Sequence, residues 1–211
     1  EILEILDAAE RLLPVANGDV YAPLLQGKVL GNLFFENSTR TRMSFESAMK
    51  RLGGEVVNLS SVGSSVAKGE TLYDTMQMVD GYSDIAVIRH PRQGAAQYSA
   101  DAIGIPVLNA GDGAGNHPTQ TMLDLFTIRQ AHGTLEGLNV VLVGDLRYGR
   151  TTHSLSHALV RFGAKLTLVS PDSLRMPNEI VGDLQSHGAD VAETENFAGS
   201  IADRSEEHTS E

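Results

Sequence analysis

The hydrophobic residues of the chain fall into two patterns, one typical of buried strands and one of amphipathic helices. Short apolar runs bounded by turn residues predict strands. These runs lie at 28–35, 55–60, 84–90, 105–111, 139–145 and 164–170. Between them, apolar residues recur three and four positions apart, the spacing of one helix face. This spacing predicts helices at 2–13, around 45–52, and at 70–82, 93–104, 117–133, 150–162 and 177–187.

Prolines and glycines mark the expected ends of several helices. Pro14 is expected to end the first helix, because a proline ring disrupts helical hydrogen bonding. Gly53 and Gly54 follow the apolar stripe at 45–52 and are expected to stop that helix. Pro118 suits the first turn of the helix that begins near His117.

Strands and helices alternate along the whole chain, which predicts an α/β fold. Such alternation is typical of parallel sheets with helices on both faces, the doubly wound arrangement. The glycine-rich link at 133–139 predicts two domains, a first at 1–133 and a second, incomplete one at 134–203. The polar segment 204–211 breaks the pattern and is expected to be a non-native tail outside the fold.

Composition narrows the classes of function. The 211 residues are 41% hydrophobic and 20% charged, as in folded globular domains. A net charge of −11 argues against non-specific binding of nucleic acid, but it permits a locally basic site for a small anion. The absence of cysteine excludes disulfides and cysteine-ligated metals. No apolar run approaches the roughly 20 residues of a membrane span.

The stretch FFENSTRTRMSFE, residues 34–46, predicts an anion site. Hydroxyl and guanidinium side chains fill positions 38–42, where a buried strand gives way to a helix. A helix start offers unpaired N–H groups and a partial positive charge, and Arg40 can hold two oxygens of one anion. The run lacks the glycine-rich loop and Gly-Lys-Ser/Thr of a P-loop.

Three further stretches carry candidate binding residues. Arg89, in IRHP, closes a strand, so its side chain is expected at the carboxyl edge of the sheet, where ligands of α/β proteins bind. His117, in HPTQ, stands at a helix start, where a neutral, hydrogen-bond-donating imidazole is favoured, and Gln120 lies on the same helix face. Arg150 begins the helix at 150–162. Gly144 and Gly149 do not form the G-x-G-x-x-G of a dinucleotide site, which disfavours a Rossmann-type oxidoreductase.

These motifs, together with SSVAKGETLYDT at 64–75, resemble in their order those of the aspartate and ornithine carbamoyltransferases. The resemblance covers nearly all of residues 1–203. It implies that four residues bind the phosphate of carbamoyl phosphate, namely Ser38, Thr39, Arg40 and Thr41, and that Arg42 is mostly structural.

The resemblance also implies roles for residues outside that run. Ser64 and Lys68 would reach into the neighbouring subunit's site, with Lys68 contacting phosphate and aspartate; the second lysine of some relatives is Ala67 here. Arg89, His117 and Thr39 would stabilise charge on the carbonyl oxygen of carbamoyl phosphate. Gln120 would accept from the carbamoyl NH2.

Arg150 in YGRTTHSL favours the aspartate branch of the family, where it would bind a carboxylate of aspartate. Glu36 lies beside the phosphate run and is expected to pair with an arginine, which the resemblance suggests is Arg150. Ornithine carbamoyl transfer and a non-catalytic phosphate-binding module are the alternatives left open.

The resemblance implies a cytoplasmic transferase of pyrimidine biosynthesis that carbamoylates L-aspartate without cofactor or metal. It implies a homotrimer, and leaves a regulatory chain open as a further partner; nucleic acid and membranes are not expected partners. A further arginine and glutamine for aspartate and a His-Pro-Leu-Pro-type loop of the family are not found in the sequence. The chain is therefore expected to be truncated and inactive alone.

Overall fold

The computed structural model describes residues 1–60, 65–113, 115–200 and 206–210. The chain divides into two compact units, Glu1–Gly115 and Asn116–Glu211, which are described separately. Each unit is built on one parallel sheet.

The sheet of the first unit has the strand order β2-β1-β3-β4. Its strands are β1 (Val29–Phe34), β2 (Glu55–Ser60), β3 (Ile85–His90) and β4 (Val107–Asp112). All neighbours run parallel, and Phe34 at the end of β1 lies opposite both Ser60 and Arg89. The carboxyl ends of β1, β2 and β3 therefore meet at one edge of the sheet.

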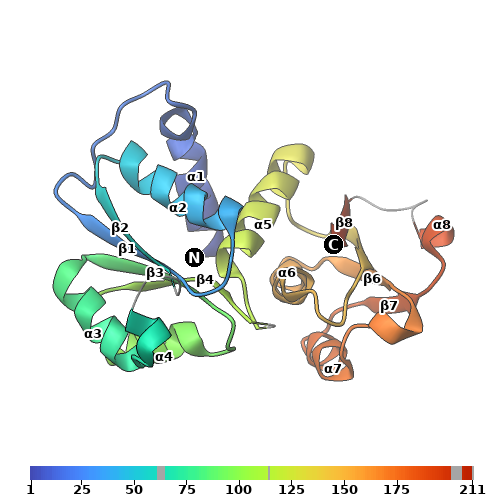
Figure 1. The fold of residues 1–211 in the computed structure, drawn as a ribbon. Helices are drawn as coiled ribbons and strands as arrows, with labels where there is room; N and C mark the ends of the chain where they lie inside the picture. The colour runs from blue at the N-terminus through green and yellow to red at the C-terminus, as the bar shows by residue number, and fades with distance from the viewer. Residues whose placement is uncertain (61–64, 114, 201–205, 211) are drawn as a thin grey trace. The chain divides into compact units, whose positions relative to one another are not determined.

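Helices cover both faces of this sheet (Figure 1). The helices are α1 (Ile2–Asn17), α2 (Thr39–Arg51), α3 (Leu72–Tyr82) and α4 (Ala95–Ala102), with a short 3₁₀ turn, η1 (Ser65–Lys68). Alternate residues of β1 point to opposite faces, so Leu30 and Phe34 pack with Met49 of α2, whereas Leu33 packs with Met76 of α3. Both faces are apolar because both are covered.

The second unit repeats this architecture with the strand order β7-β6-β5-β8, again all parallel. Its strands are β5 (Asn139–Gly144), β6 (Lys165–Val169), β7 (Val191–Thr194) and β8 (Glu206–Ser210). Its helices are α5 (Pro118–His132), α6 (Arg150–Val160), α7 (Asn178–Ser186) and α8 (Phe197–Ser200), with a 3₁₀ turn, η2 (Asp172–Leu174). Leu142, Leu155 and Leu159 are among its fully buried side chains.

The predicted α/β fold with parallel sheets is confirmed, and one predicted helix end is wrong. Helix α1 continues through Pro14 to Asn17 and ends at Gly18, whose φ of 86° is the left-handed conformation of a C-cap. Pro14 lies in the last turn, where its carbonyl accepts from Asp19 and Val20 beyond the helix. Val15 is buried, so packing holds the turn that proline alone would weaken.

The second unit contains more strands than the sequence predicts. Two runs were expected to form strands there, 139–145 and 164–170, but β7 and β8 join β5 and β6, and β8 lies in the segment 204–211 that was expected outside the fold. Strand β8 pairs with β5 through backbone groups, and such pairing does not require apolar side chains. The compact units divide at 115/116, and the domain boundary predicted at 133/134 stays a prediction.

Candidate active site

One edge of the first sheet gathers most of the predicted binding residues of this unit. Residues 36–42 follow the end of β1, Lys68 in η1 follows β2, and Arg89 is the fifth residue of β3. Because Phe34 and Arg89 are paired across the sheet, the residues after β1 begin beside Arg89. This is the edge at which parallel α/β sheets bind ligands. Lys68 is exposed, and Ser64 lies outside the described residues.

The predicted phosphate-binding run lies at the N-cap and in the first turn of α2. Ser38 is the N-cap residue with extended backbone angles, and its side chain makes no capping hydrogen bond. The first turn contains no acidic residue. Arg40 is exposed and forms no hydrogen bond or ion pair with any described residue. The first N–H groups of a helix have no partner within it, so hydroxyl, guanidinium and backbone donors are present together at this turn.

Arg89 is buried and held by Glu36. Its Nη2 donates to Glu36 Oε1 over 2.6 Å and its Nε donates to the same oxygen over 3.3 Å. The Arg89 carbonyl also accepts from Phe35 N over 2.9 Å, which ties Glu36 to the edge of β3. Glu36 thus pairs with an arginine, as predicted, and that arginine is Arg89; pairing with Arg150 stays a prediction. Arg89 as a residue is 9% exposed, and its Nη1 has no partner among the described residues.

The loop after Arg89 is locked against the end of β4, a feature that sequence reasoning missed. The Asp112 carboxylate is buried and accepts from Gly94 N over 2.8 Å. Gly113 has a φ of 57°, and a Cβ there would lie 2.6 Å from the carbonyl oxygen of Pro91. The glycines of NAGDGAG therefore permit a close approach of two loops that fixes the residues around Arg89.

His90 should make the first unit less stable in mild acid. Burial, and then the positive charge of Arg92, lower the pKa of His90 below its ordinary value of 6.5. Its Nδ1 accepts from Arg92 N over 3.0 Å, which requires the unprotonated nitrogen. The folded state therefore binds this proton less readily than the unfolded state, and stability should fall as pH drops below about 6.5.

The variant His90→Asn tests this expectation, because an amide oxygen can replace Nδ1 as the acceptor and does not titrate. Urea unfolding of both proteins between pH 7.5 and 5.5 should show a smaller loss of stability in the variant. Equal pH dependence in the two proteins would contradict the assignment.

In the second unit, His117 caps α5. Its Nδ1 accepts from Gln120 N over 3.4 Å, and Thr119 Oγ1 lies at the same distance. In a neutral ring, an accepting Nδ1 leaves the proton on Nε2, and this arrangement fits the donor role expected of His117. His117 is 5% exposed, and its backbone N donates to Ser154 Oγ over 3.3 Å, which joins the start of α5 to α6.

Gln120 is oriented by a bond that sequence reasoning missed. Its Nε2 donates to Asp124 Oδ1 over 2.9 Å, one turn further along α5. With the NH2 group used in this way, the amide oxygen points to the other side and is the group available to accept a hydrogen bond. This arrangement fits the role predicted for Gln120, which was to accept from a carbamoyl NH2.

Arg150 is the first residue of α6, after the N-cap residue Gly149. Its backbone N donates to Tyr148 O over 2.9 Å, and the side chain is partly buried. His153, one turn further, is buried and its Nε2 bonds to the Leu146 carbonyl over 2.7 Å. His153 therefore has a structural partner in the Leu146 carbonyl.

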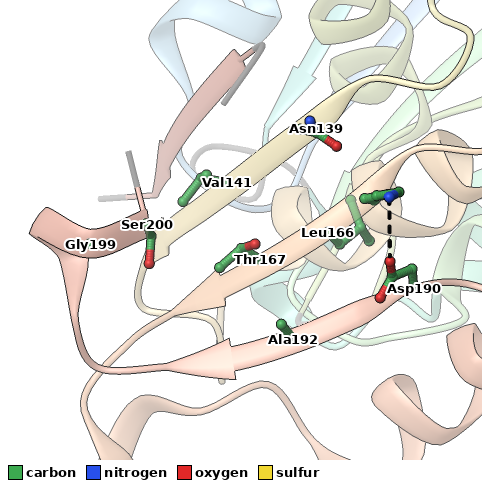
Figure 2. Close-up of a pocket in the computed structure, with 9 residues that line it drawn as sticks. Asn139, Val141, Leu166, Thr167, Asp190, Ala192, Gly199 and Ser200 are labelled. Atoms are coloured by element: carbon green, nitrogen blue, oxygen red, sulfur yellow. Dashed lines mark ion pairs between the residues drawn. The ribbon is translucent and has the colours of Figure 1, made fainter. Parts of the chain in front are cut away.

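A hollow of about 420 Å³ over β5, β6 and β7 contains none of the predicted site residues. Figure 2 shows Val141, Thr167 and Ala192 along it, with Ser200 of α8 at one side. Its charged side chains, Lys165 and Asp190, form an ion pair with 3.9 Å between Nζ and Oδ2. This pair is weak because it is exposed and its atoms are far apart. The hollow is therefore separate from the predicted anion site, and its one basic side chain is already paired with a carboxylate.

A metal-binding cluster and a membrane-spanning helix are both absent from the part of the chain that the structure describes. No group of three or more His, Cys, Asp or Glu side chains in this part of the chain is placed to hold a metal ion. None of the described helices combines the length and apolar character needed to cross a bilayer.

The model of the carbamoyl-phosphate binding domain of aspartate/ornithine carbamoyltransferases matches residues 1–130. The chain belongs to the aspartate/ornithine carbamoyltransferase family. Within this family, its curated relatives include proteins named aspartate carbamoyltransferase catalytic subunit. The one from Methanococcoides burtonii is 55% identical over 198 residues, which are 93% of this chain and 64% of that protein. The one from Thermococcus kodakarensis is 54% identical with the same coverage.

Solved structures of the family are similar to this chain over nearly its whole length. Aspartate transcarbamoylase from Trypanosoma cruzi in complex with carbamoyl phosphate and aspartate matches with a TM-score of 0.93 and 41% identity. The match covers 99% of this chain and 68% of that one. The catalytic subunit of M. jannaschii aspartate transcarbamoylase matches with a TM-score of 0.92 and 46% identity, over 99% of this chain and 69% of that one. The chain spans about 64% of the length of the curated relatives.

Proposed function

We propose that the protein containing this chain transfers the carbamoyl group of carbamoyl phosphate to the amine of L-aspartate. The observation that carries the proposal is the first turn of α2, where Ser38, Thr39, Arg40 and Thr41 stand at the sheet edge that also holds Arg89. This turn combines the donors that a phosphate dianion requires. The complex of the Trypanosoma cruzi relative with carbamoyl phosphate and aspartate supports the same substrates.

The proposed reaction needs positioning and charge stabilisation rather than a protein nucleophile. The aspartate amine attacks the carbamoyl carbon, the C–O bond to phosphate breaks, and phosphate leaves with the bonding electrons. Thr39, Arg89 and His117 stabilise negative charge on the carbonyl oxygen. Phosphate is held by Ser38, Arg40, Thr41 and Lys68. The departing phosphate accepts the proton that the amine loses.

Arg89 and Gln120 are each oriented in advance for these roles. Glu36 fixes the Arg89 guanidinium, so little conformational freedom is lost when Nη1 binds a ligand oxygen. Asp124 fixes the Gln120 amide with its oxygen available for the carbamoyl NH2. Arg150, at the start of α6, binds a carboxylate of aspartate in this proposal, together with Lys68.

The assembly and location belong to the same proposal. In this proposal the protein is a homotrimer in which Ser64 and Lys68 of one subunit reach the site of the next, and the exposure of Lys68 in η1 is compatible with such a contact. We place the enzyme in the cytoplasm, in pyrimidine biosynthesis. The relatives are named catalytic subunits, which leaves a regulatory chain as a further partner.

The deciding experiment supplies the full-length protein with carbamoyl phosphate and either L-aspartate or L-ornithine. Carbamoyl aspartate and phosphate should form in equal amounts, and ornithine should react at least about a hundred times more slowly, because Arg150 offers a carboxylate partner that an ammonium group cannot use. Preferential formation of citrulline would assign the ornithine reaction instead. Phosphate binding without turnover of either amine would indicate a non-catalytic phosphate-binding module.

A further inference from the structure

A polar side chain lies in the middle of an otherwise apolar strand. Asn32 is the fourth residue of β1, between Leu30 and Phe34 on the face covered by α2, and it is fully buried. Its Nδ2 donates to the carbonyl oxygen of Arg42 over 3.4 Å and to Asn58 Oδ1 over 2.8 Å. Both hydrogens of the amide are therefore used, one on α2 and one on β2.

Asn58 extends this contact to the next turn of α2. It is the residue directly opposite Asn32 in the parallel pairing of β1 and β2. Its Nδ2 donates to Glu46 Oε2 over 3.1 Å, and the other oxygen of Glu46 accepts from Lys50 Nζ over 2.7 Å. Hydrogen bonds from Lys50 and then from Asn58 lower the pKa of Glu46 below 4.5, so its carboxylate stays charged at neutral pH.

Two points of α2 are thus fixed to the sheet by amide groups. Arg42 directly follows the phosphate-binding run, and Glu46 lies one turn further along the same helix face. Bonds at two successive turns restrict both the rotation of α2 about its axis and its movement along the strands. A shift of either kind would carry Ser38 and Arg40 away from Arg89, which is fixed separately by Glu36.

We propose that Asn32 and Asn58 are positioning residues that set the phosphate-binding turn of α2 relative to Arg89. This role rests on the proposed function of that turn. The buried Oδ1 of Asn32 has no hydrogen-bond partner among the described residues. Burying an unpaired acceptor is unfavourable, and an apolar side chain of similar size would avoid it. Stability alone therefore does not account for an amide at this position, whereas its two directed bonds to α2 and β2 do.

The test is Asn32→Leu in the full-length protein, which keeps the number and branching of the side-chain heavy atoms and removes both directed bonds. We expect the KM for carbamoyl phosphate and the Kd for inorganic phosphate to rise about tenfold, since small displacements of a binding group cost this much or more. The melting temperature should be unchanged or higher. Asn58→Ala, at an exposed position, should raise both constants about threefold in the same direction.

Lys50→Ala is the matched control, because it removes the exposed ion pair and leaves the amide bonds in place. Its KM and Kd should stay within about twofold of wild type. Unchanged phosphate affinity in both asparagine variants would overturn the positioning role. So would a loss of affinity that follows a loss of thermal stability, because that result describes a purely structural residue. Wild-type protein that neither binds phosphate nor turns over carbamoyl phosphate would overturn the proposed function itself, and this role with it.

Discussion

Replacing Arg40 with alanine in the full-length protein is expected to raise the KM for carbamoyl phosphate about a hundredfold without changing the stability of the fold. Each hydrogen bond to a charged group contributes roughly 1.5 kcal/mol or more, and a guanidinium can form two with one phosphate. Their loss costs about 3 kcal/mol, and each 1.4 kcal/mol is about a factor of ten in affinity. Arg40 is exposed and bonds to no described residue, so the folded state loses nothing.

Arg40→Lys separates charge from geometry at this position. A lysine keeps the positive charge but presents a point charge rather than a planar pair of donors, so its KM should rise about tenfold. Arg11→Ala is the control, because it removes an exposed guanidinium from α1. Steady-state kinetics and melting curves of the three variants decide the matter. A KM for Arg40→Ala within threefold of wild type would show that Arg40 does not bind the phosphate, and a melting temperature lowered by several degrees would show that Arg40 supports the fold.

The architecture could be predicted from the sequence because burial on two faces leaves a clear pattern. The runs that became β1 and β3 are mostly apolar, and such runs are typical of parallel strands covered on both sides. Strand β7 was missed because two of its four residues, Glu193 and Thr194, are polar, and a short polar segment does not differ from a loop by composition. The end of α1 was predicted too early, at Pro14, because the packing of Val15 and the cap at Gly18 hold a last helical turn that proline disfavours.

The sequence indicates the proposed ligand-binding groups of the candidate site, but it does not indicate the residues that hold these groups in position. Charged and hydroxyl residues at element ends stand out, as residues 38–42 do, because such residues have little structural reason to cluster there. The partners of these residues come from tertiary contacts between distant parts of the chain. The bond of Glu36 to Arg89 depends on the pairing of β1 with β3, and the contact of Asn32 with Asn58 depends on the pairing of β1 with β2. The spacing of residues within a short segment predicts neither the register of a sheet nor its strand order.

His117 combines a structural and a proposed chemical role, and two substitutions should separate them. His117→Asn in the full-length protein should keep the stability of the wild type, because asparagine is a good N-cap and can accept from the backbone of α5 as Nδ1 does. The same variant removes the Nε2–H donor. We therefore expect its kcat to fall about 100- to 1000-fold, the usual effect of removing one donor to a developing oxyanion.

His117→Ala removes the cap as well as the donor. Its kcat should fall as far as that of His117→Asn, and its free energy of unfolding should decrease by about 1 kcal/mol, the usual contribution of an N-cap side chain. Single-turnover rates with saturating carbamoyl phosphate and aspartate, measured beside urea unfolding, test both parts. If His117→Asn retained kcat within a few-fold while His117→Ala lost both activity and stability, the side chain would serve only to begin α5. The charge on the carbonyl oxygen would then have to be stabilised by Arg89 and Thr39.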